Sequence, residues 1–125
     1  LPDETTAAVQ ATLARVLADA KIEITPTEEF GVGTPSPLDG PAPAAIAKVA
    51  REMWPGLPMV PFMSRGATDS RFLRARGVAA YGISPIPLTE DDARRAHGVD
   101  ERIPDGGLRT GVEFLHRLVV ELAGK

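Results

Sequence analysis

The chain has 125 residues, no cysteine, and a formal charge of −3 from 14 basic and 17 acidic side chains. This length allows one small domain with a modest core, and the hydrophobic share of 43% excludes a disordered chain. The charge excludes a general nucleic-acid-binding field, the lack of cysteine excludes a disulfide framework and thiolate chemistry, and no apolar run reaches the roughly 20 residues that span a bilayer.

The first 43 residues are predicted to form a helix, a short strand and a linker. Residues 1–20 carry apolar side chains at helical spacing, at Val9, Leu13, Val16 and Leu17. Residues 21–25 alternate between polar and apolar side chains, which is typical of a strand with one buried face. The segment 26–43 has five prolines and no periodicity, so we expect a linker between two structural units.

The order of the predicted elements in the rest of the chain is typical of an α/β protein. A helix starting near Pro43 is followed by an apolar strand at 59–63, a short helix closed by Gly77, and a second apolar strand at 78–83. A polar loop at 84–102 then leads to a helix over 105–123. This order predicts a parallel sheet with right-handed crossovers. We expect the last helix to turn one apolar stripe inward: Leu108, Val112, Leu115, Val119 and Leu122.

Two loops that follow the predicted strands are the candidate sites, because ligands bind at the carboxyl ends of parallel strands. In the first loop, Gly66 and Ala67 allow close backbone approach, Thr68 offers a hydroxyl, and Asp69 can cap the next helix. Four arginines make this stretch basic: Arg65, Arg71, Arg74 and Arg76. The loop could bind an anion, or it could be an ordinary turn with solvated arginines.

The second loop contains His97, followed by Asp100 and Glu101. An imidazole beside carboxylates could be a zinc ligand that a carboxylate orients by hydrogen bonding. The alternative is an ordinary surface histidine. The other histidine, His116, is expected to be a partly buried structural side chain of the last helix, and the acidic run 90–92 before Arg94 is expected to be a solvated loop face.

Three sequence runs, taken in order, resemble the C-terminal third of a known enzyme family. They are MSRGATDSRF at 63–72, GVAAYGI at 77–83 and AHGVDERI at 96–103. The family is that of the dizinc metallopeptidases and amidohydrolases, which includes aminoacylase, carboxypeptidase S, glutamate carboxypeptidase, acetylornithine deacetylase and succinyl-diaminopimelate desuccinylase. The resemblance extends over nearly the whole chain.

The resemblance implies a site and a chemistry. His97 matches the histidine that ligates one of two zinc ions, and Gly66, Ala67 and Thr68 match a loop that lines the substrate pocket. Asp69, Asp100 and Glu101 match residues that support the site. The implied reaction is hydrolysis of the amide bond of a peptide or an N-acyl amino acid by a zinc-held water. The family's other zinc ligands and its general base have no counterpart in this sequence, so no catalytic residue is expected here.

The resemblance also implies a domain organisation. Residues 1–36 would be the remnant of an inserted α+β lid domain, through which such enzymes form homodimers, and residues 37–125 would be the C-terminal part of the catalytic domain. Its sheet, parallel or mixed, would be flanked by helices. We therefore expect an inactive C-terminal portion that needs the rest of its polypeptide, and the absence of an initiator Met before Leu1 agrees with this. The alternative is a non-catalytic α/β module that binds an anion or a partner.

Overall fold

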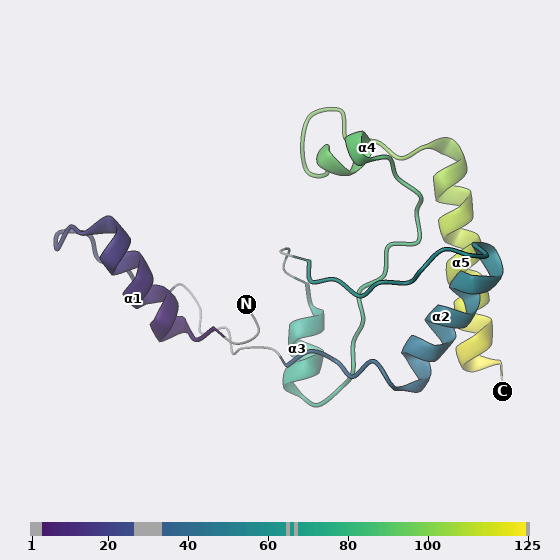
Figure 1. The fold of residues 1–125 in the computed structure, drawn as a ribbon, viewed down its shortest axis with the longest axis horizontal. Coiled ribbons are helices and arrows are strands. Elements are labelled where there is room, and N and C mark those ends of the chain that lie inside the picture. Colours follow the sequence, from purple (N-terminus) through teal and green to yellow (C-terminus); the bar gives the residue numbers. More distant parts are fainter. Residues whose placement is uncertain (1–3, 27–33, 65, 67, 125) are drawn as a thin grey trace. The chain divides into compact units, whose positions relative to one another are not determined.

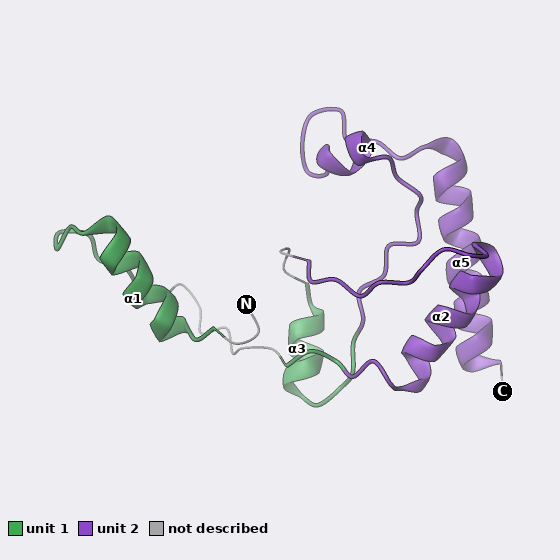
Figure 2. Ribbon diagram, in the orientation of Figure 1, with its two compact units in different colours: residues 1–36, 66–80 green, residues 37–65, 81–125 purple. Residues whose placement is uncertain are grey.

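The computed structural model describes residues 4–26, 34–64, 66 and 68–124, which contain five helices (Figure 1). In chain order these are α1 (Thr6–Leu17), α2 (Pro41–Met53), α3 (Ser70–Ala75), α4 (Glu90–Arg94) and α5 (Asp105–Ala123). The chain divides into two compact units, residues 1–36 with 66–80 and residues 37–65 with 81–125 (Figure 2). Within the described ranges no helix is long and apolar enough to cross a membrane.

The prediction of an α/β fold with a sheet is wrong, because none of the described residues belongs to a β-strand. The sequence predicts strands at 21–25, 59–63 and 78–83. A strand needs the backbone of a neighbouring strand as hydrogen-bonding partner. At Ala80 a side chain takes the place of that neighbouring backbone. The Ser36 hydroxyl accepts a hydrogen bond from the Ala80 N–H at 2.9 Å and donates one to the Ala80 carbonyl at 3.0 Å.

The core of the second unit lies between α2 and α5, the one pair of described helices that pack against each other (Figure 1). Val49 of α2 and Phe114 of α5 are almost completely buried, together with Ala45 and Leu118. The Phe114 ring stacks on Trp54, with ring centroids 5.5 Å apart. Burial of these side chains from water stabilises the pair.

The inward face predicted for α5 is wrong. Its expected stripe is exposed at all five positions, namely Leu108, Val112, Leu115, Val119 and Leu122. The buried stripe lies one residue earlier along the helix and consists of Gly107, Gly111, Phe114 and Leu118. Both stripes have helical spacing, but the two glycines of the second let the chain at Ile86 approach the helix closely, since a Cβ added at Gly111 would lie 2.8 Å from Ile86 Cγ1.

Several helix ends follow the sequence signals. Thr5 is the N-cap of α1, and its hydroxyl oxygen accepts a hydrogen bond from the Ala8 N–H at 3.1 Å. After α3, Gly77 has a left-handed backbone with φ of 76°. Its N–H donates to Arg74 O at 2.9 Å and the next N–H, of Val78, donates to Leu73 O at 3.0 Å. These two bonds form a Schellman motif, so the prediction that Gly77 closes this helix is confirmed.

Candidate functional site

The first candidate loop contributes Gly66, Thr68 and Asp69, which are all exposed, whereas Ala67 and Arg65 lie outside the described residues. Asp69 was expected to cap α3, but its side chain makes no cap hydrogen bond. The Thr68 hydroxyl oxygen accepts from the Ser70 N–H instead, at 3.2 Å. Asp69 is therefore the N-cap residue of α3 by position, but its side chain does not make the predicted capping hydrogen bond.

The basic side chains after this loop are used within the first unit. The Arg71 guanidinium lies over the Phe72 ring, 4.4 Å from its centroid, as a cation–π contact. Arg74 Nη1 donates to the Ala80 carbonyl at 3.3 Å. Binding of an anion at this loop remains a prediction.

The second candidate loop begins with a helix where the sequence predicted only a polar loop. Thr89 is the N-cap of α4 and forms a capping box with Asp92. The Thr89 hydroxyl oxygen accepts from the Asp92 N–H at 3.2 Å, and the Thr89 N–H donates to Asp92 Oδ2 at the same distance. The spacing of Thr89 and Asp92 is the sequence signal for this helix, and it was overlooked because the acidic run was interpreted as a solvated face.

Asp92 is also the centre of an ion-pair cluster. Arg102 donates from Nε to Asp92 Oδ1 at 2.7 Å and from Nη2 to Asp91 Oδ2 at 2.8 Å. The Asp92 side chain is only 7% exposed, which makes it the buried charged residue of the described part of the chain. Hydrogen bonds from Thr89, and next from Arg102, lower the pKa of Asp92 to about 2, so this carboxylate stays charged at neutral pH.

The ion pairs of Arg102 with Asp91 and Asp92 close the loop that carries His97. This loop turns back beside α4 (Figure 1). His97 is exposed and has a left-handed backbone with φ of 62°, and Asp100 has the same conformation with φ of 58°. The Asp100 carboxylate forms an ion pair with Arg95 Nη1 at 3.6 Å, and Glu101 is exposed. The loop therefore presents an imidazole to solvent on a defined turn.

A zinc site can be tested against these residues. An imidazole is a donor that zinc prefers, and His97 is accessible on the loop surface. However, the described residues include no group of three or more His, Asp or Glu side chains that could hold a metal ion. His97 therefore fits as one ligand of a zinc site, and the described residues do not supply the others.

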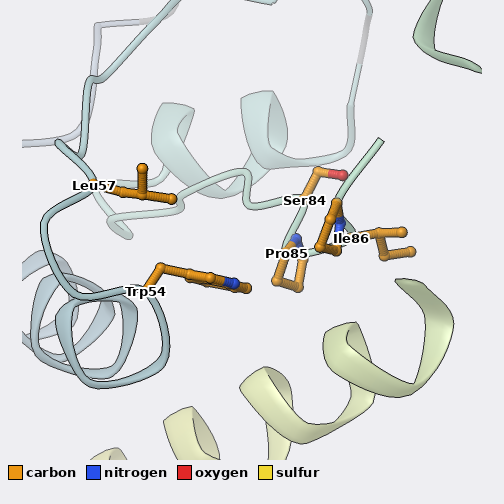
Figure 3. A pocket seen from close by; sticks show the side chains of 6 residues that line it. Trp54, Leu57, Ser84, Pro85 and Ile86 are labelled. Atoms are coloured by element: carbon orange, nitrogen blue, oxygen red, sulfur yellow. The ribbon is translucent and has the colours of Figure 1, made fainter. Parts of the chain in front are cut away.

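Two other features are less suited to chemistry. His116 was expected to be partly buried, but it is exposed on α5. A pocket in the second unit is lined by six residues: Trp54, Leu57, Ser84, Pro85, Ile86 and Pro87 (Figure 3). Apart from the Ser84 hydroxyl and the Trp54 indole nitrogen, its side chains are apolar, so it contains no carboxylate, imidazole or ammonium group.

Comparison with known proteins gives the family. Residues 2–121 match the model of peptidase family M20/M25/M40, and the chain belongs to this family. Aminoacylase-1 from Homo sapiens is 36% identical over 90 residues, which cover 72% of this chain and 21% of that protein. N-fatty-acyl-amino acid synthase/hydrolase PM20D1 from Homo sapiens is 27% identical over 121 residues, which cover 94% of this chain and 24% of that protein.

The chain thus spans about a fifth to a quarter of the length of the curated relatives that it matches. No solved structure matches it significantly. The family resemblance inferred from the runs around Thr68 and His97 is confirmed, whereas the roles of the individual residues remain predictions.

Proposed function

We propose that this chain is the C-terminal portion of a zinc-dependent hydrolase that cleaves the amide bond of peptides or N-acyl amino acids. The observation that carries the proposal is the family match over residues 2–121. The names of two relatives point the same way, since one is an aminoacylase and the other an N-fatty-acyl-amino acid synthase/hydrolase. In this proposal His97 supplies one zinc ligand, and the loop with Gly66, Ala67 and Thr68 contacts the substrate.

Exposed apolar surface supports the need for further polypeptide. The outer stripe of α5, from Leu108 to Leu122, is exposed along the helix, and Phe62 is 86% exposed. Large contiguous apolar surfaces are rare on monomeric soluble proteins and mark sites of contact. We propose that the rest of the same polypeptide covers this stripe and supplies the remaining zinc ligands. The assignment of residues 1–36 to a lid domain that forms a homodimer belongs to the same proposal.

Zinc content and turnover test the role of His97. In the longer protein that carries this chain, His97→Ala should remove one zinc ion and most hydrolysis of N-acyl amino acids. His116→Ala is the matched control, because it removes the other exposed histidine from the same chain. Unchanged zinc content and rate in His97→Ala would show that His97 is not a ligand.

The isolated chain tests the need for the rest of the protein. With zinc added, the 125-residue chain should not hydrolyse N-acyl amino acids or dipeptides above the rate in buffer, because the described residues hold no metal cluster. Turnover at the rate of a longer enzyme would contradict the proposal that further ligands are required.

A further inference from the structure

We propose that Arg95 and Arg102 are positioning residues, which hold His97 in its left-handed backbone conformation by pairing with the first turn of α4. The inference rests on the proposed function in so far as His97 is a metal ligand. In this proposal the two arginines act through the backbone of the loop between them.

The two ends of the loop are tied to one oxygen atom. Arg95 Nε donates to Asp91 Oδ2 at 3.2 Å, and Arg102 Nη2 donates to the same oxygen at 2.8 Å. The guanidinium groups of Arg95 and Arg102 therefore meet at one carboxylate, and these contacts close the loop of six residues between them. The Gly98 N–H donates to the Arg95 carbonyl at 2.8 Å within this turn.

We call the contacts of Arg95 and Arg102 with Asp91 and Asp92 the clamp. The carboxylate of Asp92, which holds Arg102, is itself fixed by other hydrogen bonds. Asp92 receives Arg102 Nε on one carboxylate oxygen and the Thr89 hydroxyl on the other, at 2.7 and 2.6 Å. A charge-assisted bond to a buried carboxylate is stronger and less screened than an exposed ion pair. Arg102 is thus held by a carboxylate that is itself buried and hydrogen-bonded.

The turn contains the strain that a clamp would explain. His97 and Asp100 both have positive φ, a backbone region that residues with a Cβ adopt less readily than glycine. Such conformations persist only where the surroundings enforce them. The backbone conformation sets the direction in which the Cα–Cβ bond leaves the chain, so the clamp would aim the His97 imidazole.

A comparison of glycine and alanine at position 97 tests this without any metal. In the parent chain, His97→Gly should give a folding equilibrium constant roughly five- to tenfold larger than His97→Ala, because glycine adopts positive φ freely. In an Arg102→Met background the loop can relax, and the advantage of glycine should disappear or reverse. Arg94→Met is the matched control background, because Arg94 forms an ion pair with Glu90 inside α4 and not with Asp91 or Asp92.

Two conservative variants extend the test. Arg102→Lys keeps the charge but lacks the planar fork that reaches Asp91 and Asp92 together, so it should restore only part of the glycine advantage. Asp91→Asn weakens the shared acceptor without touching the capping box of Thr89. If Arg102→Met does not fold, the same comparison is made in these two backgrounds. The amide-to-α-proton scalar coupling of residue 97 reports its φ directly.

An equal glycine advantage in the Arg102→Met and Arg94→Met backgrounds would overturn the proposal, as would an unchanged scalar coupling at residue 97. This result is independent of the role of His97 in zinc binding. If His97→Ala keeps its zinc in the longer protein while the glycine advantage behaves as expected, the proposed function fails and the clamp stands. If His97→Ala loses its zinc but the glycine advantage does not depend on Arg102, the clamp is wrong and the proposed function stands.

Discussion

Arg102 and Thr89 meet on one buried carboxylate, that of Asp92. Arg102 donates from Nε to Oδ1 at 2.7 Å, and the Thr89 hydroxyl donates to Oδ2 at 2.6 Å. The same side chain therefore begins α4 and holds the far end of the His97 loop. Removal of either Thr89 or Arg102 as a donor should therefore destabilise both the start of α4 and the His97 loop, because a buried carboxylate left without its donors is unfavourable.

Thr89→Ala should lower the free energy of unfolding by about 1 kcal/mol, and the melting temperature by roughly 5 °C, because α4 loses its N-cap. Thr110→Ala is the matched control. The Thr110 hydroxyl donates to the Gly106 carbonyl inside α5, where the backbone is already helical, so the change should stay within about 0.5 kcal/mol. Thermal unfolding followed by circular dichroism measures both. Equal losses would mean that the capping box does not stabilise the chain.

The stability of the chain should depend on the charge of Asp92 at acidic pH. The pKa of Asp92 is lowered from its ordinary 3.8 to about 2, so folding favours the carboxylate. Its contribution is fully present above about pH 4 and is lost as the pH falls through 2. Urea unfolding of the parent chain and of Asp92→Asn should therefore differ at pH 5 and converge as the pH approaches about 2.

The titration of Asp92 can also be followed directly by carbon NMR of its carboxyl group. Hydrogen bonding from Thr89 is the largest cause of the lowered pKa. Thr89→Ala should therefore raise the titration midpoint towards 3.8, and Arg94→Met should leave it unchanged. A midpoint near 3.8 in the parent chain would contradict the hydrogen-bonded cluster.

The sequence predicted α1, α2, α3 and α5, but it missed α4 and predicted a sheet that the described residues do not form. The bounds of α5 were predicted at residues 105 and 123, because its apolar and polar side chains recur with the period of a helix. Residues 78–83 have an equally clear strand composition. A strand, however, is completed by another chain segment, and composition cannot say whether that partner is present. At Ala80 its backbone groups bind the Ser36 hydroxyl instead.

The residues of the candidate site could be proposed from the sequence, but the contacts that hold their loop in place could not. His97 and the acidic residues after it are visible in the sequence, and so is the family to which they point. The clamp depends on Arg102 reaching back ten residues to Asp92, a pairing that no local pattern encodes. Likewise, α5 carries two stripes of helical spacing, and only the close approach of Ile86 to Gly111 distinguishes the buried one.

Neighbouring residues on α5 should differ sharply when truncated. Phe114 is 3% exposed and stacks on Trp54, whereas Leu115 is 45% exposed. Phe114→Ala should lower the free energy of unfolding by about 3–5 kcal/mol, since it leaves a cavity in a small core. Leu115→Ala should cost less than about 1 kcal/mol. Urea unfolding followed by circular dichroism compares them, and a larger loss in Leu115→Ala would mean that α5 packs through its other stripe.

Two glycines of α5 should respond in opposite directions to alanine. A Cβ at Gly106 would meet no atom within 4 Å, so Gly106→Ala should raise the free energy of unfolding by about 0.5 kcal/mol through helix propensity. A Cβ at Gly111 would lie 2.8 Å from Ile86 Cγ1, and overpacking of this kind costs about 1–3 kcal/mol, more than propensity returns. Gly111→Ala should therefore destabilise the chain. Combining it with Ile86→Ala should give a loss smaller than the sum of the two single losses, because the clashing atom is gone. Strictly additive losses in thermal unfolding would show that Ile86 does not pack against this face of α5.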